Sequence, residues 1–309
     1  MALILLSLLS FSLNSQALSG QNSRGGNRSD AIILPSLQWG VIKSVMPELV
    51  SGSGPFAGPA DIWNPNYGFL VQSTDPASYA LNFPTTGADG LYFDLIIMGE
   101  ASELTWTPVT HEGITATVTR KTECNRECDV EFRVTLTGPE ARAKINNPHP
   151  SLIAKPRLPQ TFELVGRDSN DNEVVRYGFV LQKWFVNRGD KQDNYPNTEA
   201  WCRDLGYRVP QVKDLTNAVC LGMWEGDWCK GSVGAIPSSS GNHYQRQIGA
   251  GFFSEWGGTY LYAGAGFVYD YQYWTSDTTG NTQFDVDSDV GDVYFNKTSN
   301  SPRGICATP

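Results

Sequence analysis

The sequence has few charged residues, and those it has are mostly acidic. Only 18% of its 309 residues are charged, and the formal net charge is −9. A protein that binds nucleic acid needs a basic face to meet the phosphates, and an anionic lipid surface makes the same demand. We therefore expect no nucleic acid as a partner and no docking on anionic membranes.

Motifs that hold metals, nucleotides or catalytic groups are also missing. None of the six cysteines lies in a CxxC pair, and His111, His149 and His243 stand outside any metal-binding or catalytic motif. No glycine-rich nucleotide loop, HExxH helix or GxSxG elbow occurs. We expect no cofactor, no catalytic residue and structural or surface roles for the histidines.

The single long apolar run is at the N-terminus. Residues 2–13, ALILLSLLSFSL, have the length of a signal-peptide core and are too short to span a bilayer comfortably. The small-x-small tripeptide at 15–17 resembles a cleavage site, yet no Lys or Arg precedes Arg24. Two interpretations stay open: residues 1–17 are a signal peptide, or the chain is a fragment of a longer protein. Residues 18–31 are polar and glycine-rich, which predicts a linker.

Glycine, proline and aromatic residues are plentiful, which favours β-structure and ordered loops over helix bundles. The length predicts two domains. Short β-rich runs follow one another from residue 32, and alternation is clean over residues 117–119 and 130–135. Period-two patterning with frequent Gly, Pro and Asn breaks predicts an antiparallel β-sandwich over residues 32–157.

A proline-rich stretch, PHPSLIAKPRLP at residues 148–159, is the predicted domain boundary because it cannot hold a helix. Two strands are expected directly after it. A helix capped by Asn197 or Thr198 and ended by Gly206 comes next, and a second helix starts near Pro210. A long loop-rich region and late strands complete a mixed α+β domain over residues 158–309.

Four tracts of this second part carry a family resemblance: AWCRDLGYRVP (200–210), FFSEWGGTY (252–260), YWTSD (273–277) and GIC (304–306). Their order is similar to that of the terminal C-type-lectin-like domain of the intimin and invasin adhesins, inverse autotransporters of Gram-negative bacteria. Residues 32–156 resemble one of the immunoglobulin-like modules of those proteins. The resemblance implies a mainly β fold, an immunoglobulin-like sandwich followed by a C-type-lectin-like domain, at the bacterial surface or outside the cell, with a receptor-binding tip that serves virulence.

The resemblance also implies a disulfide between the first helix and the C-terminus, at Cys202 and Cys306. This leaves Cys220 and Cys229 as a further expected pair, although connectivity does not follow from sequence alone. Separately, Cys124 and Cys128 flank a three-residue loop between two predicted strands, where a disulfide would close the hairpin. Two free thiols are the alternative there.

Two features of the family are absent from the sequence. No series of ten-residue amphipathic strands of a membrane barrel occurs, so we expect no direct membrane insertion. The tripeptides Glu-Pro-Asn, Gln-Pro-Asp and Trp-Asn-Asp, with which calcium-dependent lectins bind cation and sugar, do not occur either. Binding without calcium is therefore expected.

Four aspartates crowd a late segment: Asp285, Asp287, Asp289 and Asp292. An EF-hand counted from the first would need Gly at position six and Glu at position twelve, and the sequence has Val and Asn there. A glycosidase would need two carboxyl groups with separated pKa values, which a solvated strand face does not provide. We expect a half-buried strand with Phe284 and Val286 inward, the first three aspartates in water, and no metal.

Aromatic residues are dense among the glycines between residues 224 and 274. Trp201, Trp256 and Trp274 stand inside the family tracts and are expected to be buried. Tyrosine is common at interface hot spots, because it offers contact area with little rotamer loss. The predicted receptor-binding residues, which flank the glycine-rich stretch 264–266, are Tyr260, Tyr262, Tyr269 and Tyr271.

These observations lead to one hypothesis and two rivals. The chain is expected to be a monomeric, non-enzymatic adhesin segment whose lectin-like tip binds a protein receptor or a surface glycan on a host or bacterial cell. The first rival is a metal-independent glycan-binding lectin that uses aromatic stacking alone. The second is a secreted glycoside hydrolase that uses the acidic strand.

Overall fold

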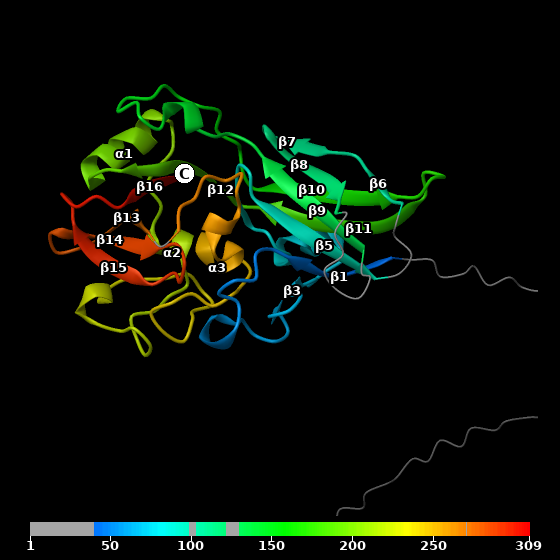
Figure 1. Ribbon diagram of the computed structural model, residues 1–309, viewed down its shortest axis with the longest axis horizontal. Helices are drawn as coiled ribbons and strands as arrows, with labels where there is room; N and C mark the ends of the chain where they lie inside the picture. The colour runs from blue at the N-terminus through cyan, green and yellow to red at the C-terminus, as the bar shows by residue number, and fades with distance from the viewer. Residues whose placement is uncertain (1–39, 99–102, 122–129, 270) are drawn as a thin grey trace, which may run out of the picture. The chain divides into compact units, whose positions relative to one another are not determined.

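Strands dominate the structure, a computed structural model that describes residues 40–98, 103–121, 130–269 and 271–309 (Figure 1). These residues belong to one compact unit. No helix within the described ranges is long and apolar enough to cross a membrane.

The N-terminal half contains a seven-stranded antiparallel sheet. Its strands, in spatial order, are β2 (Trp63–Asn64), β3 (Gly68–Leu70), β1 (Val41–Met46), β5 (Tyr92–Met98), β9 (Val130–Thr137), β8 (Ile114–Arg120) and β7 (Val109–His111). A second sheet has the order β11 (Glu173–Leu181), β10 (Gln160–Arg167) and β6 (Thr105–Trp106). The predicted pairing of β8 with β9 is confirmed, with Val118 opposite Val134.

The two sheets pack face to face around alternating apolar side chains. Phe93 and Leu95 of β5 and Phe179 of β11 are fully buried, and the rings of Phe93 and Phe179 meet edge to face at 5.8 Å. This is the sandwich that the period-two pattern predicts.

The domain boundary expected after residue 157 does not coincide with a break in strand pairing. Strands β10 and β11 follow that position, yet β10 pairs with β6 and completes the sandwich. The proline-rich stretch is instead a connection that lies against the second half, where Tyr207 donates from its hydroxyl to the Ala154 carbonyl at 2.7 Å. Proline excludes helix and inner strand, but it does not tell which strands pair across it.

The C-terminal half is built on a mixed six-stranded sheet. Its order is β15 (Val293–Lys297), β14 (Thr282–Asp287), β13 (Gln272–Thr279), β16 (Arg303–Ala307), β12 (Lys183–Gln192) and β4 (Thr86–Ala88). Helices α1 (Tyr195–Asp204), α2 (Val212–Leu215) and α3 (Phe252–Trp256) pack on it (Figure 1). Five 3₁₀ turns are also described: η1 (Gly54–Phe56), η2 (Pro76–Leu81), η3 (Arg142–Lys144), η4 (Asp227–Cys229) and η5 (Thr259–Leu261). The predicted fold class is confirmed.

Helix α1 begins earlier than the predicted caps. Asn194 is the cap, and its side chain accepts a hydrogen bond from the Asn197 N–H at 3.0 Å. Pro196 fits the first turn, where its missing N–H costs nothing. Gly206 follows the helix with φ of 88°, a conformation that favours glycine, so the predicted stop is correct.

Both disulfides expected in the C-terminal half are present. Cys202 of α1 is bonded to Cys306 of β16, and Cys220 is bonded to Cys229. Cys124 and Cys128 lie outside the described residues. Trp201, Trp256 and Trp274 are fully buried, as predicted.

A buried carboxylate joins the two halves. Glu255 of α3 accepts hydrogen bonds from the backbone N–H and the hydroxyl groups of Thr85 and Thr86, and from the Gly249 N–H at 2.8 Å. Burial raises its pKa, while these donors act against that shift. Strand β4 of the N-terminal half also pairs with β12, so a segment next to the sandwich strand β5 is part of the six-stranded sheet.

Candidate functional site

The four predicted receptor-binding tyrosines differ in exposure. Tyr269 is 56% exposed, Tyr271 is 36% exposed, and Tyr260 is half-buried against the Tyr269 ring. Tyr262 is 1% exposed, so the prediction for it is wrong. Its hydroxyl donates to the Trp256 carbonyl at 3.0 Å and accepts from the Glu48 N–H at 2.8 Å. A polar tip that finds such partners allows a tyrosine to lie in the core.

The main group of exposed apolar side chains lies elsewhere, in and directly after the segment that the second disulfide closes. We define the clamped loop as residues 220–241, the yellow segment beneath β15 in Figure 1. Of fourteen large hydrophobic residues exposed in the described part, six lie in it: Leu221, Met223, Trp224, Trp228, Val233 and Ile236. Exposed apolar residues that cluster in this way mark interaction sites in soluble proteins.

The clamped loop is tied to the frame at several points. The Asn242 side chain donates to the Trp224 carbonyl and to the Val293 carbonyl of β15, both at 3.1 Å. The Ala235 N–H donates to the Thr216 carbonyl at 2.9 Å. A loop held in this way loses little conformational entropy on binding, so its exposed side chains are pre-organised for contact.

Trp224 has an unusual backbone conformation, with φ of 59°. Left-handed backbone is strained for a bulky residue and persists only where the surroundings impose it. The Asn242 hydrogen bond and ring contacts with Phe56 at 6.0 Å and His243 at 5.9 Å supply that restraint. In this restrained conformation the Trp224 indole stays at the surface, where it is 43% exposed.

Trp228 connects the clamped loop to the edge of the sheet. Its ring, 41% exposed, lies nearly parallel to the ring of Tyr294 in β15, with 6.2 Å between centroids. Strand β15 is the outermost strand of the six-stranded sheet (Figure 1). The apolar surface therefore continues from the loop onto the sheet edge.

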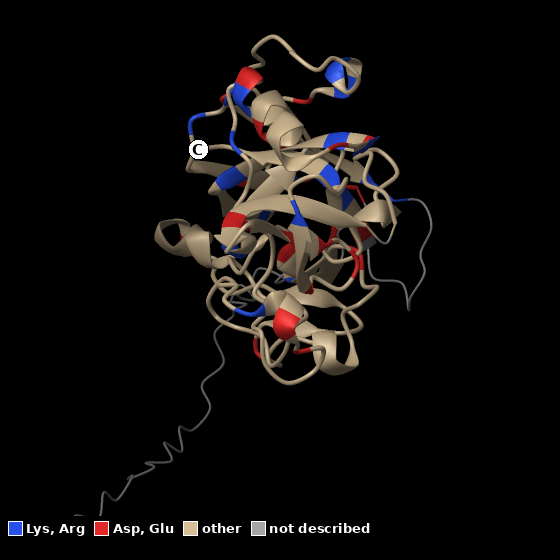
Figure 2. Cartoon of the chain, turned by 90° about the vertical axis from the view of Figure 1, so that its left-hand side faces the viewer, with Lys and Arg blue, Asp and Glu red and all other residues tan. Residues whose placement is uncertain are grey.

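Charge is sparse over this part of the molecule. Residues 231–245 contain no charged residue, and only Glu225, Asp227 and Lys230 are charged between 221 and 230. Figure 2 shows the same contrast, with few coloured segments in the lower part of the view and many near the top. The surface is suited to contact by apolar burial and hydrogen bonding rather than by ion pairing.

The acidic strand differs from the prediction. Asp285 is fully buried, and Asp287 and Asp292 are 4% and 5% exposed, so the expectation that this face is solvated was wrong. No three His, Cys, Asp or Glu side chains in the described ranges are placed to hold a metal ion. A hydrolase would need carboxyl groups that substrate can touch, and Asp285 is closed to solvent.

Burial raises the pKa of Asp285 to about 7, and the nearby Asp292 and Asp287 carboxylates add to that shift. A hydrogen bond from Asn296 acts in the opposite direction. The raised pKa that the sequence did not suggest therefore belongs to a carboxyl group that solvent and substrate cannot reach.

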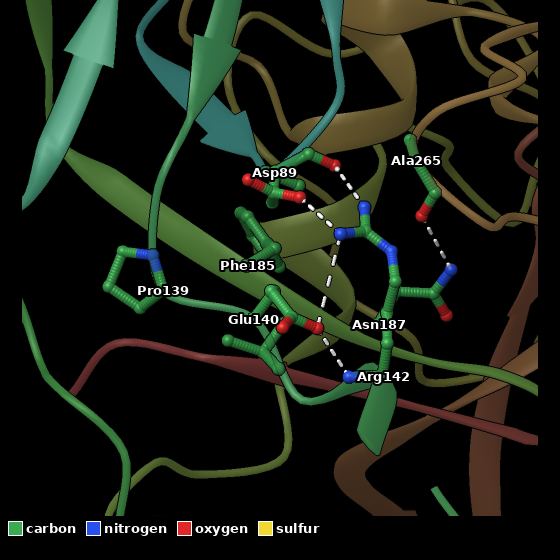
Figure 3. Close-up of a pocket in the computed structure, with 9 residues that line it drawn as sticks. Asp89, Pro139, Glu140, Arg142, Phe185, Asn187 and Ala265 are labelled. Atoms are coloured by element: carbon green, nitrogen blue, oxygen red, sulfur yellow. Dashed lines mark hydrogen bonds and ion pairs between the residues drawn. The ribbon is translucent and has the colours of Figure 1, made fainter. Parts of the chain in front are cut away.

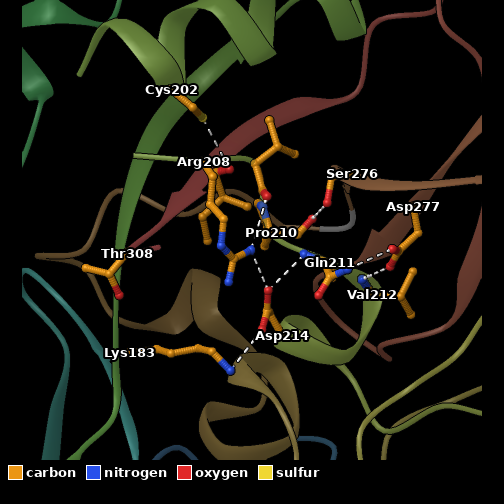
Figure 4. Close-up of polar contacts among 12 residues, drawn as sticks. Lys183, Cys202, Arg208, Pro210, Gln211, Val212, Asp214, Ser276, Asp277 and Thr308 are labelled. Carbon is orange, nitrogen blue, oxygen red and sulfur yellow. Dashed lines mark hydrogen bonds and ion pairs between the residues drawn. The ribbon is translucent and has the colours of Figure 1, made fainter. Parts of the chain in front are cut away.

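A second buried aspartate is fully paired. Asp214 of α2 bonds to Lys183 at 2.9 Å, to Arg208 at 2.7 Å and to the Gln211 N–H at 2.9 Å (Figure 4). Burial alone would raise its pKa, but these donors hold the pKa below its usual value. This cluster orients α2 and offers no free group.

Two cavities lie away from the clamped loop, and each was a possible site for a ligand or for catalysis. The pocket in Figure 3 has a volume of about 20 Å³ and is filled by the ion pair of Arg142 with Asp89, 2.6 Å apart. A groove of about 550 Å³ lies in the sandwich between β1 and β11, where Val41, Val71 and Val174 line it. Neither cavity brings together groups that could do chemistry.

The sequence indicates a loop between Cys220 and Cys229 and an aromatic region that includes Trp224 and Trp228, but it does not single out the aliphatic residues Leu221, Val233 and Ile236. The available signal was the pair of cysteines nine residues apart around a segment with two Gly and two Trp. Such a closed loop is too short to bury its own apolar side chains.

Comparison with solved structures finds two adhesins. The crystal structure of invasin, a bacterial integrin-binding protein, is similar with a TM-score of 0.48 and 12% identity over 87% of this chain and 39% of that chain. The C-terminal 282-residue fragment of intimin, in complex with the intimin-binding domain of the translocated intimin receptor, is similar with a TM-score of 0.46 and 11% identity, over 87% of this chain and 65% of that chain. This chain thus spans less than two thirds of either.

No family model matches the chain, and no curated protein sequence is similar to it. Both solved structures belong to the group of proteins that the four sequence tracts resemble, at 11–12% identity. What this chain binds depends on its own surface residues.

Proposed function

We propose that the chain is an adhesin segment that binds a protein receptor on a host or bacterial surface through the clamped loop, without calcium and without catalysis. The observation that carries the proposal is the set of six exposed large apolar side chains on a hydrogen-bonded loop, four of them within the segment that the Cys220–Cys229 disulfide closes. Burial of apolar side chains against a partner supplies most of the favourable free energy in most protein association.

The fused frame supports this role. Glu255 and the β4–β12 pairing fix the lectin-like half to the sandwich, so the loop is presented at a constant distance and orientation. A bacterial surface location and attachment to the outer membrane are part of the same proposal.

The proposal is tested with beads coated with the full chain and incubated with candidate cells. A variant with Leu221→Ser, Trp224→Asn and Ile236→Ser removes three of the exposed side chains; asparagine tolerates the left-handed backbone at 224. Hot-spot residues each contribute about 2 kcal/mol or more, so we expect at least a tenfold loss of binding with an unchanged unfolding temperature. The control is Leu152→Ser, since Leu152 is 72% exposed outside the loop and should be silent.

Treatment of the cells separates protein from glycan. If a protein is the receptor, protease treatment of the cells should abolish bead binding and glycosidase treatment should not. The opposite result would favour a glycan, for which the Trp228–Tyr294 pair beside Asn296 and Asp292 offers an aromatic platform with polar neighbours. Equal binding by the triple variant and the wild type would refute the role of the loop.

A further inference from the structure

Asp285 lies on the second strand of the six-stranded sheet, between two strands that are hydrogen-bonded to it. It lies on β14, opposite Trp274 of β13 on one side and opposite Tyr294 of β15 on the other. Its side chain is fully buried. One carboxyl oxygen, Oδ2, accepts from the Asn296 side chain at 2.7 Å, and the other, Oδ1, has no hydrogen-bond partner.

The charged groups closest to Asp285 have the same sign as its carboxylate. Asp287 lies on the same strand, and Asp292 precedes β15, where its backbone carbonyl accepts from the Asp287 N–H at 3.0 Å. Both carboxylates act on Asp285, and Tyr294 hydrogen-bonds to Asp292 through its hydroxyl. Within the described part of the chain, Asp285 forms no ion pair.

Among the described residues, the other elements packed around this edge bring one buried cation near it, Arg303 of β16, which lies over the Tyr271 ring, acts on Tyr273 together with Asp287, and forms no ion pair with Asp285. On β13, Asp277 accepts from the Val212 N–H of α2 at 2.7 Å. On β15, Lys297 is exposed and alternates with Asn296, so it lies on the opposite face of the strand. On η4, Asp227 is exposed.

The remaining charged groups near this edge belong to α2 and the residue after η4. In α2, Lys213 is exposed and Asp214 is paired with Lys183 and Arg208. Lys230, which follows η4, is exposed as well. Ionised Asp285 would therefore be a buried charge without an opposite charge, an arrangement that destabilises a fold strongly.

The unfavourable free energy of that charge would weaken the strand pairing at the edge of the proposed receptor surface. Strand β15 is bonded to the sheet through β14, and Tyr294 supports Trp228 of η4. Repulsion among Asp285, Asp287 and Asp292 acts across the β14–β15 pairing. Weaker pairing would free the Trp228–Tyr294 stack.

We propose that Asp285 is a proton-controlled latch: with a proton bound, its carboxyl group holds β15 and the Trp228–Tyr294 surface in place, and loss of the proton loosens both. The link to receptor binding rests on the function proposed above for the clamped loop. The effect on β15 itself does not.

The direction of the effect follows from proton linkage. Burial and the neighbouring carboxylates raise the pKa of Asp285 to about 7, above the usual value of a carboxyl group, so the folded state holds a proton that the unfolded state releases. Stability from this group is complete below about pH 4 and is lost as the pH rises to about 7. Above that pH its contribution is constant, and a mildly acidic surface favours the tightened state.

The first test measures urea unfolding of the full chain between pH 4.5 and 8.5. Relative to Asp285→Asn, which is neutral at every pH, the unfolding equilibrium constant of the wild type should rise by up to about tenfold per pH unit until about pH 7 and then level off. The matched control Asp227→Asn removes an exposed carboxylate near the same edge and should keep the wild-type profile. Parallel profiles for wild type and Asp285→Asn would overturn the proposal.

Hydrogen exchange locates the effect and needs no variant. After correction for intrinsic rates, protection of amides in residues 282–297 of the wild type should fall between pH 6 and 7 by more than protection in β10 and β11, which follows global unfolding alone. A uniform change over the whole chain would overturn the latch. These readouts involve no receptor, so failure of the latch and failure of the proposed receptor surface are seen in separate experiments.

Discussion

The clamped loop and strand β14 distribute polarity in opposite ways. The loop exposes Leu221, Trp224 and Ile236, although apolar side chains usually lie inside. Strand β14 buries Asp285 and Asp287, although carboxylates usually lie in water. Both regions depart from the ordinary distribution, and β15 connects them, because Tyr294 lies opposite Asp285 and contacts Trp228. The difference teaches that hydrophobic burial alone does not explain the arrangement of this edge, as the proposed receptor surface would require.

Removal of each disulfide tests the difference between the frame and the clamped loop. These changes have the largest expected effects on the free energy of unfolding. Cys202–Cys306 closes 104 residues, and Cys220–Cys229 closes nine. In the chain-entropy model, replacing the first pair by serine should lower the free energy of unfolding by about 4–5 kcal/mol, and replacing the second pair by about 2–3 kcal/mol.

The variant that loses less stability should lose more binding. Folded Cys220→Ser/Cys229→Ser protein should lose bead binding, because the clamped loop is no longer closed. Cys202→Ser/Cys306→Ser protein should still bind at a temperature where it is folded. Urea unfolding and bead binding on the same samples check both, and loss of binding only with the frame disulfide would contradict this assignment.

A smaller effect separates the buried tyrosine from the exposed one. Tyr262→Phe removes a hydroxyl that serves two buried backbone groups, so the free energy of unfolding should fall by about 1–2 kcal/mol. The matched change Tyr269→Phe, at an exposed position, should alter it by less than about 0.5 kcal/mol. Thermal unfolding of both variants measures the difference, and equal destabilisation would show that Tyr262 is not the core residue described here.

Local patterns predicted the parts of the fold that depend on local physics. Alternation at Val118 and Val134 indicated the sandwich strands, and Gly206 marked the end of α1. The pairing of Cys202 with Cys306 came from family resemblance, since residue spacing alone leaves connectivity open.

Long-range contacts account for the failures. The partner of β10 is β6, on the far side of the predicted boundary, and no local pattern encodes that choice. Alternation in β14 predicts one solvated face, but residues 283–287 are all buried, because elements distant in sequence such as α2 pack against the strand. For the same reason nothing in the local sequence distinguished buried Tyr262 from exposed Trp224.

The central claim is that the clamped loop, and not the Tyr269 region, touches the receptor. Photo-crosslinking tests it most directly, with benzoylphenylalanine placed at position 236 or at position 269 of the full chain bound to cells. Both sites are exposed, at 84% and 56%, so a probe at either position can reach a bound partner. The account predicts a crosslinked surface protein from position 236 and none from position 269; the reverse pattern would contradict it.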